Sequence, residues 1–166
     1  MNASVKKIII IFVVPVLFAG CYSFTGGNIP SHLKSIFIAS VKDNSGFGNP
    51  KYRESLYQKL IEEFRNDGSL SVAEKAGDAR LSVSIISIRE ETIAVNPGQV
   101  ETERKIVVTC EAEYYDNVKK KLIWKKSFPN FGNFQIANAA TARDLAISTA
   151  INQIAADVLF AVVSGW

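Results

Sequence analysis

Residues 79–115 read ARLSVSIISIREETIAVNPGQVETERKIVVTCEAEYY, and this stretch decides the fold. Two long β-rich segments, 79–95 and 99–115, are separated only by Asn96, Pro97 and Gly98, residue types that are common in tight turns. The pattern predicts a β-hairpin. Each segment would reach roughly 50 Å if fully extended, which is longer than a small domain's core covers. We therefore expect the tip of the hairpin to project.

The second segment alternates between apolar and polar residues with a period of two. Its two faces carry Ile106, Val108, Cys110, Ala112 and Tyr114 on one side, and Lys105, Thr109, Glu111 and Glu113 on the other. This alternation predicts a sheet with one buried and one solvated face. In the first segment Leu81, Val83 and Ile85 alternate, but the apolar phase then shifts, which indicates a β-bulge within residues 84–87.

Before the hairpin, the sequence predicts a short strand over 36–41, a turn at DNSGFGNP (43–50) and one amphipathic helix. Asn49 can cap this helix, Pro50 suits its first turn and Gly68 can stop it. Apolar residues recur at helical spacing at Leu56, Tyr57, Leu60, Ile61 and Phe64. Residues 70–72 suggest only a short extended piece.

After the hairpin, the sequence predicts a turn over 116–121, a strand over 122–128 that Pro129 ends, and a long C-terminal helix. Thr141 and Asp144 suggest a weak capping box for this helix. Its apolar surface comprises Leu145, Ile147, Ile151, Ile154, Val158 and Phe160, and the interspersed polar residues argue against a membrane span. The order β-α-β-β-β-α predicts an α+β fold, a two-layer α/β sandwich with two helices on one face of a mainly antiparallel four-stranded sheet.

The first 21 residues resemble a bacterial lipoprotein signal. Two lysines precede an apolar run over residues 8–18, and two small residues then lead to Cys21. A membrane-spanning helix needs about 20 apolar residues, and this shorter run also contains Pro15, so a span is the weaker interpretation. The resemblance implies acylation of the Cys21 thiol, although Phe18 stands where such signals usually have leucine. An ordinary secretory signal or an uncleaved anchor is the alternative.

Cleavage before Cys21 would divide the chain into a signal peptide (1–20), a lipidated cysteine with its tether (21–34) and a single domain (35–166). In the lipoproteins that this signal resembles, aspartate directly after the cysteine is associated with retention in the inner membrane. Tyr22 stands at that position here, so the resemblance implies residence in the outer membrane. Removing the two lysines of the signal lowers the 19 basic residues to 17, against 16 acidic ones. A nearly neutral exported domain is not expected to bind nucleic acid.

We expect no catalytic group, no metal and no cofactor. His32, the only histidine, lies in the tether and is expected to be a solvated loop residue. One histidine and one thiol without metal-binding spacing form no recognisable set of ligands. Because Cys110 lies on the apolar face of its strand, it is expected to be a buried, inert thiol.

Two further patterns favour structural explanations. The segment Ser45-Gly46-Phe47-Gly48 lies between a strand and a helix, but it lacks the GxGxxG and GK[ST] patterns, so a plain turn is favoured over a nucleotide site. The hairpin brings acidic residues opposite basic ones, which favours cross-strand ion pairs on a wet face over catalytic carboxylates. The residues concerned are Glu90, Glu91, Glu101 and Glu103, with Arg89, Arg104 and Lys105.

Five lysines crowd the last predicted hairpin: Lys119, Lys120, Lys121, Lys125 and Lys126. On an outer-membrane protein such a patch could bind the phosphates of lipopolysaccharide through charge-assisted contacts. The alternative is that the lysines keep a turn soluble and protect a sheet edge. The five lysines are therefore candidate lipopolysaccharide-binding residues, assigned on charge alone.

Five strings occur in one order along the chain: CYSFTGGNIP (21–30), SIFI (35–38), GDARLSVSI (77–85), ERKIVVT (103–109) and VVSGW (162–166). With them the chain resembles the LptE lipopolysaccharide-assembly lipoproteins of the Bacteroidetes and Chlorobi groups. The resemblance implies a non-catalytic protein, lipid-anchored at the periplasmic face of the outer membrane. It also implies two partners, lipopolysaccharide and the β-barrel LptD, inside which such a protein would sit as a plug and whose assembly it would aid.

The alternative from the residues is a CsgG-like or other periplasmic secretion or assembly lipoprotein, in which a strand and a Gly/Asn-Pro turn also precede a helix. Such proteins form rings, so particle size would distinguish the two hypotheses. A lipid-anchored hydrolase is a third class, and no constellation of residues supports it.

Overall fold

The computed structural model describes residues 29–93, 98 and 101–164. The predicted signal peptide, Cys21 and most of the tether lie outside these residues. The elements run in the order β1 (Ser35–Ile38), β2 (Lys42–Asp43), α2 (Pro50–Asp67), β3 (Ser71–Ala73), β4 (Ala79–Thr92), β5 (Glu103–Asp116), β6 (Lys121–Gln135), the 3₁₀ turn η2 (Ile136–Asn138) and α3 (Ala139–Ser164).

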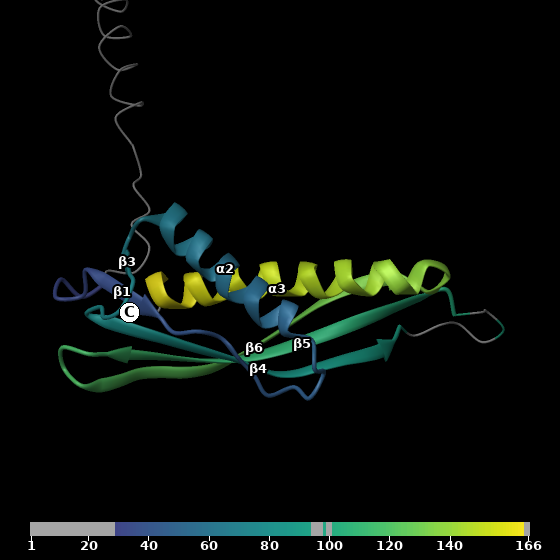
Figure 1. The fold of residues 1–166 in the computed structure, drawn as a ribbon, viewed down its shortest axis with the longest axis horizontal. Coiled ribbons are helices and arrows are strands. Elements are labelled where there is room, and N and C mark those ends of the chain that lie inside the picture. Colours follow the sequence, from purple (N-terminus) through teal and green to yellow (C-terminus); the bar gives the residue numbers. More distant parts are fainter. Residues whose placement is uncertain (1–28, 94–97, 99–100, 165–166) are drawn as a thin grey trace, which may run out of the picture.

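A single mixed sheet forms one layer of the domain (Figure 1). Its strand order is β3-β1-β4-β5-β6, and β2 also pairs with β4. β1 runs parallel to β3 and β4, and β2 runs parallel to β4, whereas β4, β5 and β6 are antiparallel neighbours. The α+β class is confirmed, but the expected four-stranded, mainly antiparallel sheet was wrong. α2 carries the chain back across the sheet, so β3 and β4, which follow it, run parallel to β1. β2 and β3 are too short to show alternation.

β4 and β5 form the predicted hairpin, from Ala79 opposite Asp116 to Thr92 opposite Arg104. Their register shifts between Ile85 and Ser87, which confirms the predicted bulge. The predicted projecting tip falls on residues 94–97 and 99–100, which lie outside the described part of the chain.

β6 continues well beyond its expected end. Pro129 was predicted to stop this strand, but it lies inside it, opposite Thr109. β6 is an edge strand, and proline, which has no N–H to donate, is tolerated where one side of a strand has no neighbour. The strand therefore spans 15 residues and follows β5 along its whole length.

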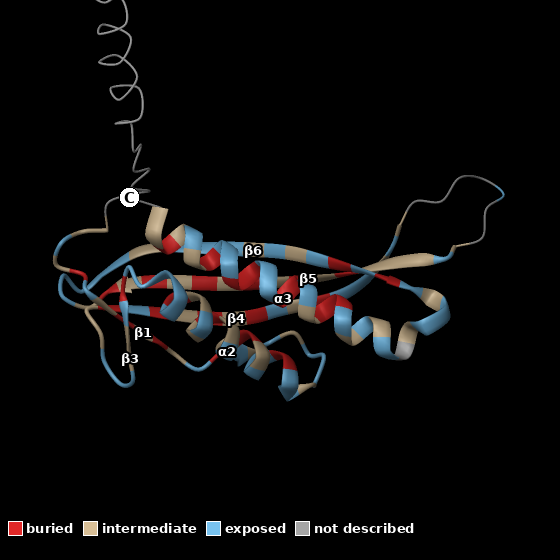
Figure 2. Cartoon of the chain, turned by 90° about the horizontal axis from the view of Figure 1, so that it is seen from above, coloured by how far each residue is buried: buried red, intermediate tan, exposed pale blue. Residues whose placement is uncertain are grey.

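Both helices cover the same face of the sheet, as predicted (Figure 1). The buried apolar residues of β5 are those expected on its apolar face, and they lie in one core with the inward stripes of α2 and α3 (Figure 2). No described helix covers the opposite face, which we call the open face. The packing is therefore one-sided, and the residues of β5 on the open face are only partly buried.

The predicted ends of α2 are confirmed. The Asn49 side chain accepts a hydrogen bond from the backbone N–H of Lys51, and Pro50 is the first helical residue. Gly68 ends the helix with φ of 70°, a left-handed conformation that glycine adopts without steric cost, and its N–H donates to the carbonyl of Phe64.

α3 is a core helix with an exposed outer stripe. Four of the predicted apolar positions are buried, but Leu145 and Phe160 are 70% and 69% exposed. Thr141–Ser164 is apolar and long enough to cross a bilayer by composition, yet its buried stripe belongs to the core shared with the sheet and α2. The capping box predicted for α3 was wrong. The 3₁₀ turn η2 leads into the helix, which begins at Ala139. The side chain of Asp144 instead accepts hydrogen bonds from α2.

β6 and α3 approach so closely at Gly132 that no side chain fits there. A Cβ added at Gly132 would lie 2.7 Å from the Cα and 2.8 Å from the carbonyl carbon of Ala146. Ala146 is itself small and buried. This pair of small residues lets the long C-terminal helix lie directly on the edge strand.

Replacing Gly132 with alanine should therefore destabilise the domain. We expect a loss of about 1–3 kcal/mol in the free energy of unfolding, because the added methyl group must push α3 away from β6. Urea denaturation of the purified, detergent-solubilised protein measures this change. Asn133→Ala, at the exposed neighbouring position, is the matched control and should change the free energy by less than about 0.5 kcal/mol. Equal stability of both variants would contradict the close approach.

Candidate interaction surfaces

The long strands give the domain two distinct ends (Figure 1). At the proximal end lie Ile29 and Pro30, the turn between β5 and β6, and the C-terminal end of α3. At the distal end lie the open end of the β4–β5 hairpin and the start of α3. Each candidate residue can therefore be assigned to an end or to a face.

The end of the predicted tether is held against the domain at two carboxylates. His32 Nε2 lies 2.7 Å from Asp116 Oδ2 at the end of β5. Asp78 Oδ2 accepts hydrogen bonds from the backbone N–H groups of Lys34 and Ser35, at 2.9 and 3.0 Å. The expectation that His32 is a solvated loop residue was wrong, because its side chain is only 25% exposed and it pairs with a buried partner.

Asp116 connects the tether to the turn between β5 and β6. Its second oxygen, Oδ1, accepts a 2.8 Å hydrogen bond from the backbone N–H of Lys119. Burial opposes ionisation of this carboxyl, but the hydrogen bonds from Lys119 and His32 prevail and hold its pKa below the usual value. One ionised carboxylate thus fixes both the last tether residues and the lysine-bearing turn.

Asp116→Asn should weaken this connection while preserving the size of the side chain. We expect the variant to lose about 1–2 kcal/mol of unfolding free energy at neutral pH, because a charged hydrogen-bond acceptor is removed. A carboxyl with a lowered folded pKa stabilises the protein above its unfolded pKa, and this contribution is lost as the pH falls through the folded pKa. The difference between variant and unmodified protein should therefore shrink below about pH 4.

Thermal unfolding measured between pH 7 and pH 3 follows this difference. Asp67→Asn, at an exposed site at the end of α2, is the matched control and should show no comparable effect. If the unfolding temperatures of Asp116→Asn and the unmodified protein differ by the same amount from pH 7 to pH 3, the role of the ionised carboxylate is contradicted.

The five candidate lysines do not form one patch. Lys125 lies on the open face, where its Nζ is 2.7 Å from Glu111 and 2.8 Å from Glu113. Lys126 lies on the helix-covered side, with its Nζ 5.3 Å from the centre of the Trp124 ring. Successive residues of a strand point to opposite faces, so this separation could have been foreseen from their positions in the sequence.

The other three lysines lie at the proximal end, in or beside the β5–β6 turn. Lys119 and Lys121 line a hollow of about 210 Å³ together with Pro30, His32 and Asp116. Lys120 has a positive φ of 53°, which lets the chain reverse at this point. The lysine turn, which we define as Lys119, Lys120 and Lys121, therefore lies next to the point where the described chain begins.

Most of the acidic and basic residues named for the hairpin form ion pairs, as predicted, but Glu103 and Arg89 form none within the described residues. Arg104 lies 2.8 Å from Glu90 and 2.9 Å from Glu101, and Lys105 lies 3.1 Å from Glu91. Arg143 of α3 also contacts Glu90 at 2.9 Å, a long-range contact that the sequence did not predict. The hydrogen bond from Arg104 is the main cause of the lowered pKa of Glu90. These pairs join the hairpin to the start of α3 at the distal end.

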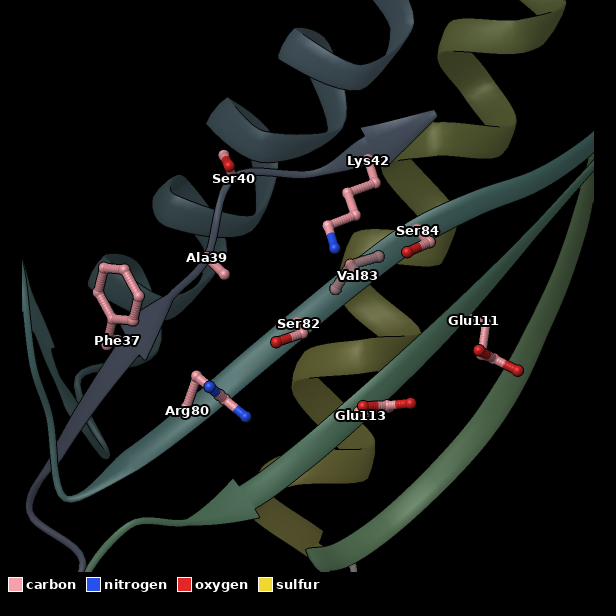
Figure 3. A pocket seen from close by; sticks show the side chains of 10 residues that line it. All are labelled: Phe37, Ala39, Ser40, Lys42, Arg80, Ser82, Val83, Ser84, Glu111 and Glu113. Carbon is pink, nitrogen blue, oxygen red and sulfur yellow. The ribbon is translucent and has the colours of Figure 1, made fainter. Parts of the chain in front are cut away.

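The open face contains a hollow of about 460 Å³ between β1 and β5 (Figure 3). Arg80 and Lys42 lie on one side of it and Glu111 and Glu113 on the other. Lys125 is the main cause of the lowered pKa of Glu113, with smaller contributions from Arg80 and Lys42. Opposite charges compensate one another here, so the hollow presents a mixed polar surface.

The remaining candidate chemistry has structural explanations. Cys110 is fully buried, and burial raises the pKa of its thiol to about 12, so its thiolate is not available at neutral pH. In the turn before α2, Asp43 accepts hydrogen bonds from the backbone and hydroxyl of Ser45, and Gly46 and Gly48 have positive φ. Within the described residues, no group of three or more potential metal ligands was found.

A family model described as LptE, lipopolysaccharide-assembly, matches residues 33–162. The chain belongs to the LptE family. The match covers every described strand and nearly all of α3. It favours lipopolysaccharide assembly over the CsgG-like alternative. No curated protein sequence matched the chain.

Solved structures share the fold at low sequence identity. Protein XCC0632 from Xanthomonas campestris aligns with a TM-score of 0.57 and 13% identity, over 84% of this chain and 92% of its own. Rare lipoprotein B from Shewanella oneidensis aligns with a TM-score of 0.54 and 13% identity, over 78% and 95%. A minor lipoprotein from Acinetobacter baumannii aligns with a TM-score of 0.57 and 10% identity, over 80% and 94%. At such low identities, the structural similarity establishes a common fold and nothing more.

Proposed function

We propose that this member of the LptE family is an outer-membrane lipoprotein, anchored at the periplasmic face through acylated Cys21. It partners a β-barrel of the LptD type, enters it as a plug, and aids its assembly and the insertion of lipopolysaccharide at the cell surface. It acts as a scaffold and not as a catalyst. The family match over residues 33–162 carries this proposal.

The shape of the domain supports a plug. β4, β5 and β6 have 14, 14 and 15 residues, so each spans about 45–50 Å along one direction. The distal end is stiffened by ion pairs among β4, β5 and α3. An elongated, one-sided sandwich held at its proximal end can extend its distal end into a lumen.

Purification of the tagged protein from gently solubilised outer membranes tests the partnership. We expect a large β-barrel protein to co-purify, and lipopolysaccharide with it. Mass spectrometry of the same sample should show a chain that begins at an acylated Cys21. Recovery of a monomer without a barrel under these conditions would refute the partnership, and an intact Met1 or an unmodified Cys21 thiol would refute the anchor.

Phe131 is the residue on the open face that we expect to contact the barrel. Its side chain is 51% exposed on β6, and the Lys105 Nζ lies 5.7 Å from the centre of its ring. Large exposed aromatic residues are common anchors of protein interfaces. Phe131→Ala should reduce the co-purified barrel about tenfold or more, equivalent to at least about 1.4 kcal/mol of binding.

Phe160→Ala is the matched control for this experiment, because Phe160 is even more exposed but lies on the outer stripe of α3 towards its C-terminal end. It should leave the yield of barrel unchanged, and both variants should retain the unfolding temperature of the unmodified protein. Equal yields from Phe131→Ala and Phe160→Ala would show that the open face is not the docking surface at this position.

A further inference from the structure

We propose that the proximal end makes a second, noncovalent contact with the membrane. The lysine turn, together with the neighbouring Val118, rests on anionic phospholipid headgroups of the leaflet that holds the anchor. This inference rests on the proposed function in one respect, the acylation of Cys21. It assigns to Lys119, Lys120 and Lys121 a ligand other than lipopolysaccharide.

The first argument is the path of the chain. His32 is bound to Asp116, and the same carboxylate accepts the backbone N–H of Lys119. Pro30 lines the same hollow as Lys119 and Lys121. The chain that leads towards Cys21 therefore starts within a few ångströms of the lysine turn, and Asp116 holds the two together.

The second argument is the length of that chain. Eight residues (22–29) lie between Cys21 and Pro30, which makes nine steps of at most about 3.6 Å each, so the anchor lies at most roughly 30 Å away. The long strands span about 45–50 Å between the two ends. The anchor therefore keeps the proximal end within roughly 30 Å of the bilayer, a limit that does not apply to the distal end.

The third argument is charge and exposure. Lys119, Lys120 and Lys121 are exposed, and within the described residues no carboxylate lies within ion-pair distance of their ammonium groups. Lys125, in contrast, is held by two glutamates. Each basic residue beside an anionic leaflet strengthens binding about fivefold, so three free lysines form an effective contact.

Exposed apolar side chains flank these lysines. Val118 precedes them and is 56% exposed, and Leu122 follows them and is 46% exposed. A cluster of cations beside apolar side chains suits the boundary between headgroups and acyl chains.

Lipopolysaccharide and anionic phospholipids offer the same phosphate chemistry to lysine. Position decides between them, because the lysine turn lies at the anchored end, where phospholipid headgroups of the same leaflet are within reach. The residues at the distal end lie farthest from the anchored end of the domain. The structure therefore favours the phospholipid surface for this turn.

A site-specific label measures the contact in the acylated, full-length protein. Val118→Cys provides one accessible thiol for a fluorophore, because Cys110 is fully buried and Cys21 is acylated. Leu145→Cys, 70% exposed near the start of α3, places the same fluorophore at the distal end. Each protein is reconstituted into phosphatidylethanolamine vesicles that contain phosphatidylglycerol and a headgroup-attached quencher. We expect quenching at residue 118, at least threefold stronger than at residue 145.

Charge reversal tests the role of the lysines in the same vesicles. Lys119→Glu with Lys120→Glu should abolish the quenching at residue 118, as should high salt. Arg53→Glu with Arg89→Glu changes the net charge equally at exposed sites outside the lysine turn, and should leave the quenching intact. Equal quenching at residues 118 and 145, or quenching that survives the lysine reversal, would overturn the inference.

Two further outcomes distinguish a failure of the proposed function from a failure of the phospholipid contact. If the protein does not float with the vesicles at all, the anchor at Cys21 is absent and the proposed function fails with it. If the protein floats and the lysine reversal instead weakens its binding to purified lipopolysaccharide without changing the quenching, the phospholipid contact is refuted. The lysines would then be lipopolysaccharide ligands, as the sequence first suggested.

Discussion

The rest of the structure depends on burying only one face of the long hairpin. The alternating residues of β5 place an unbroken apolar row under the two helices, including Val108, Cys110 and Tyr114, which are fully buried. Because the side-chain period is two, a one-residue slip in register would move this whole row to solvent. The open face, the position of α3 and the separation of the two ends all follow from this one constraint.

One-sided burial also explains how the domain can be both long and stable. The strands extend far in one direction, and α3, with 26 residues, covers β5 and β6 along most of their length. Gly132 and Ala146 bring this helix onto the edge strand without an intervening side chain. The two ends are then reinforced differently, by the carboxylate of Asp116 at the proximal end and by the pairs of Arg104 and Arg143 at the distal end.

The candidate residues differ in which end of the domain they occupy. The lysine turn and the chain leading to Cys21 share the proximal end, whereas the contacts that join the hairpin to α3 lie at the distal end. If Cys21 is acylated as we propose, the proximal end faces the membrane that holds the anchor and the distal end is free to meet a partner. The family membership and the arrangement of charges are the two observations on which the proposed scaffold role and orientation rest.

The sequence by itself determined the local structure: the hairpin, the bulge near Ile86, the caps of α2 and the buried row of β5. These features depend on neighbouring residues, whose spacing and backbone preferences can be read directly. Only the tertiary structure decided that β1 and β2 run parallel to β4, that His32 binds Asp116, and that Arg143 of α3 pairs with Glu90. These outcomes depend on contacts between residues far apart in the chain, which are set by how the helices return the strands to the sheet and not by any local pattern.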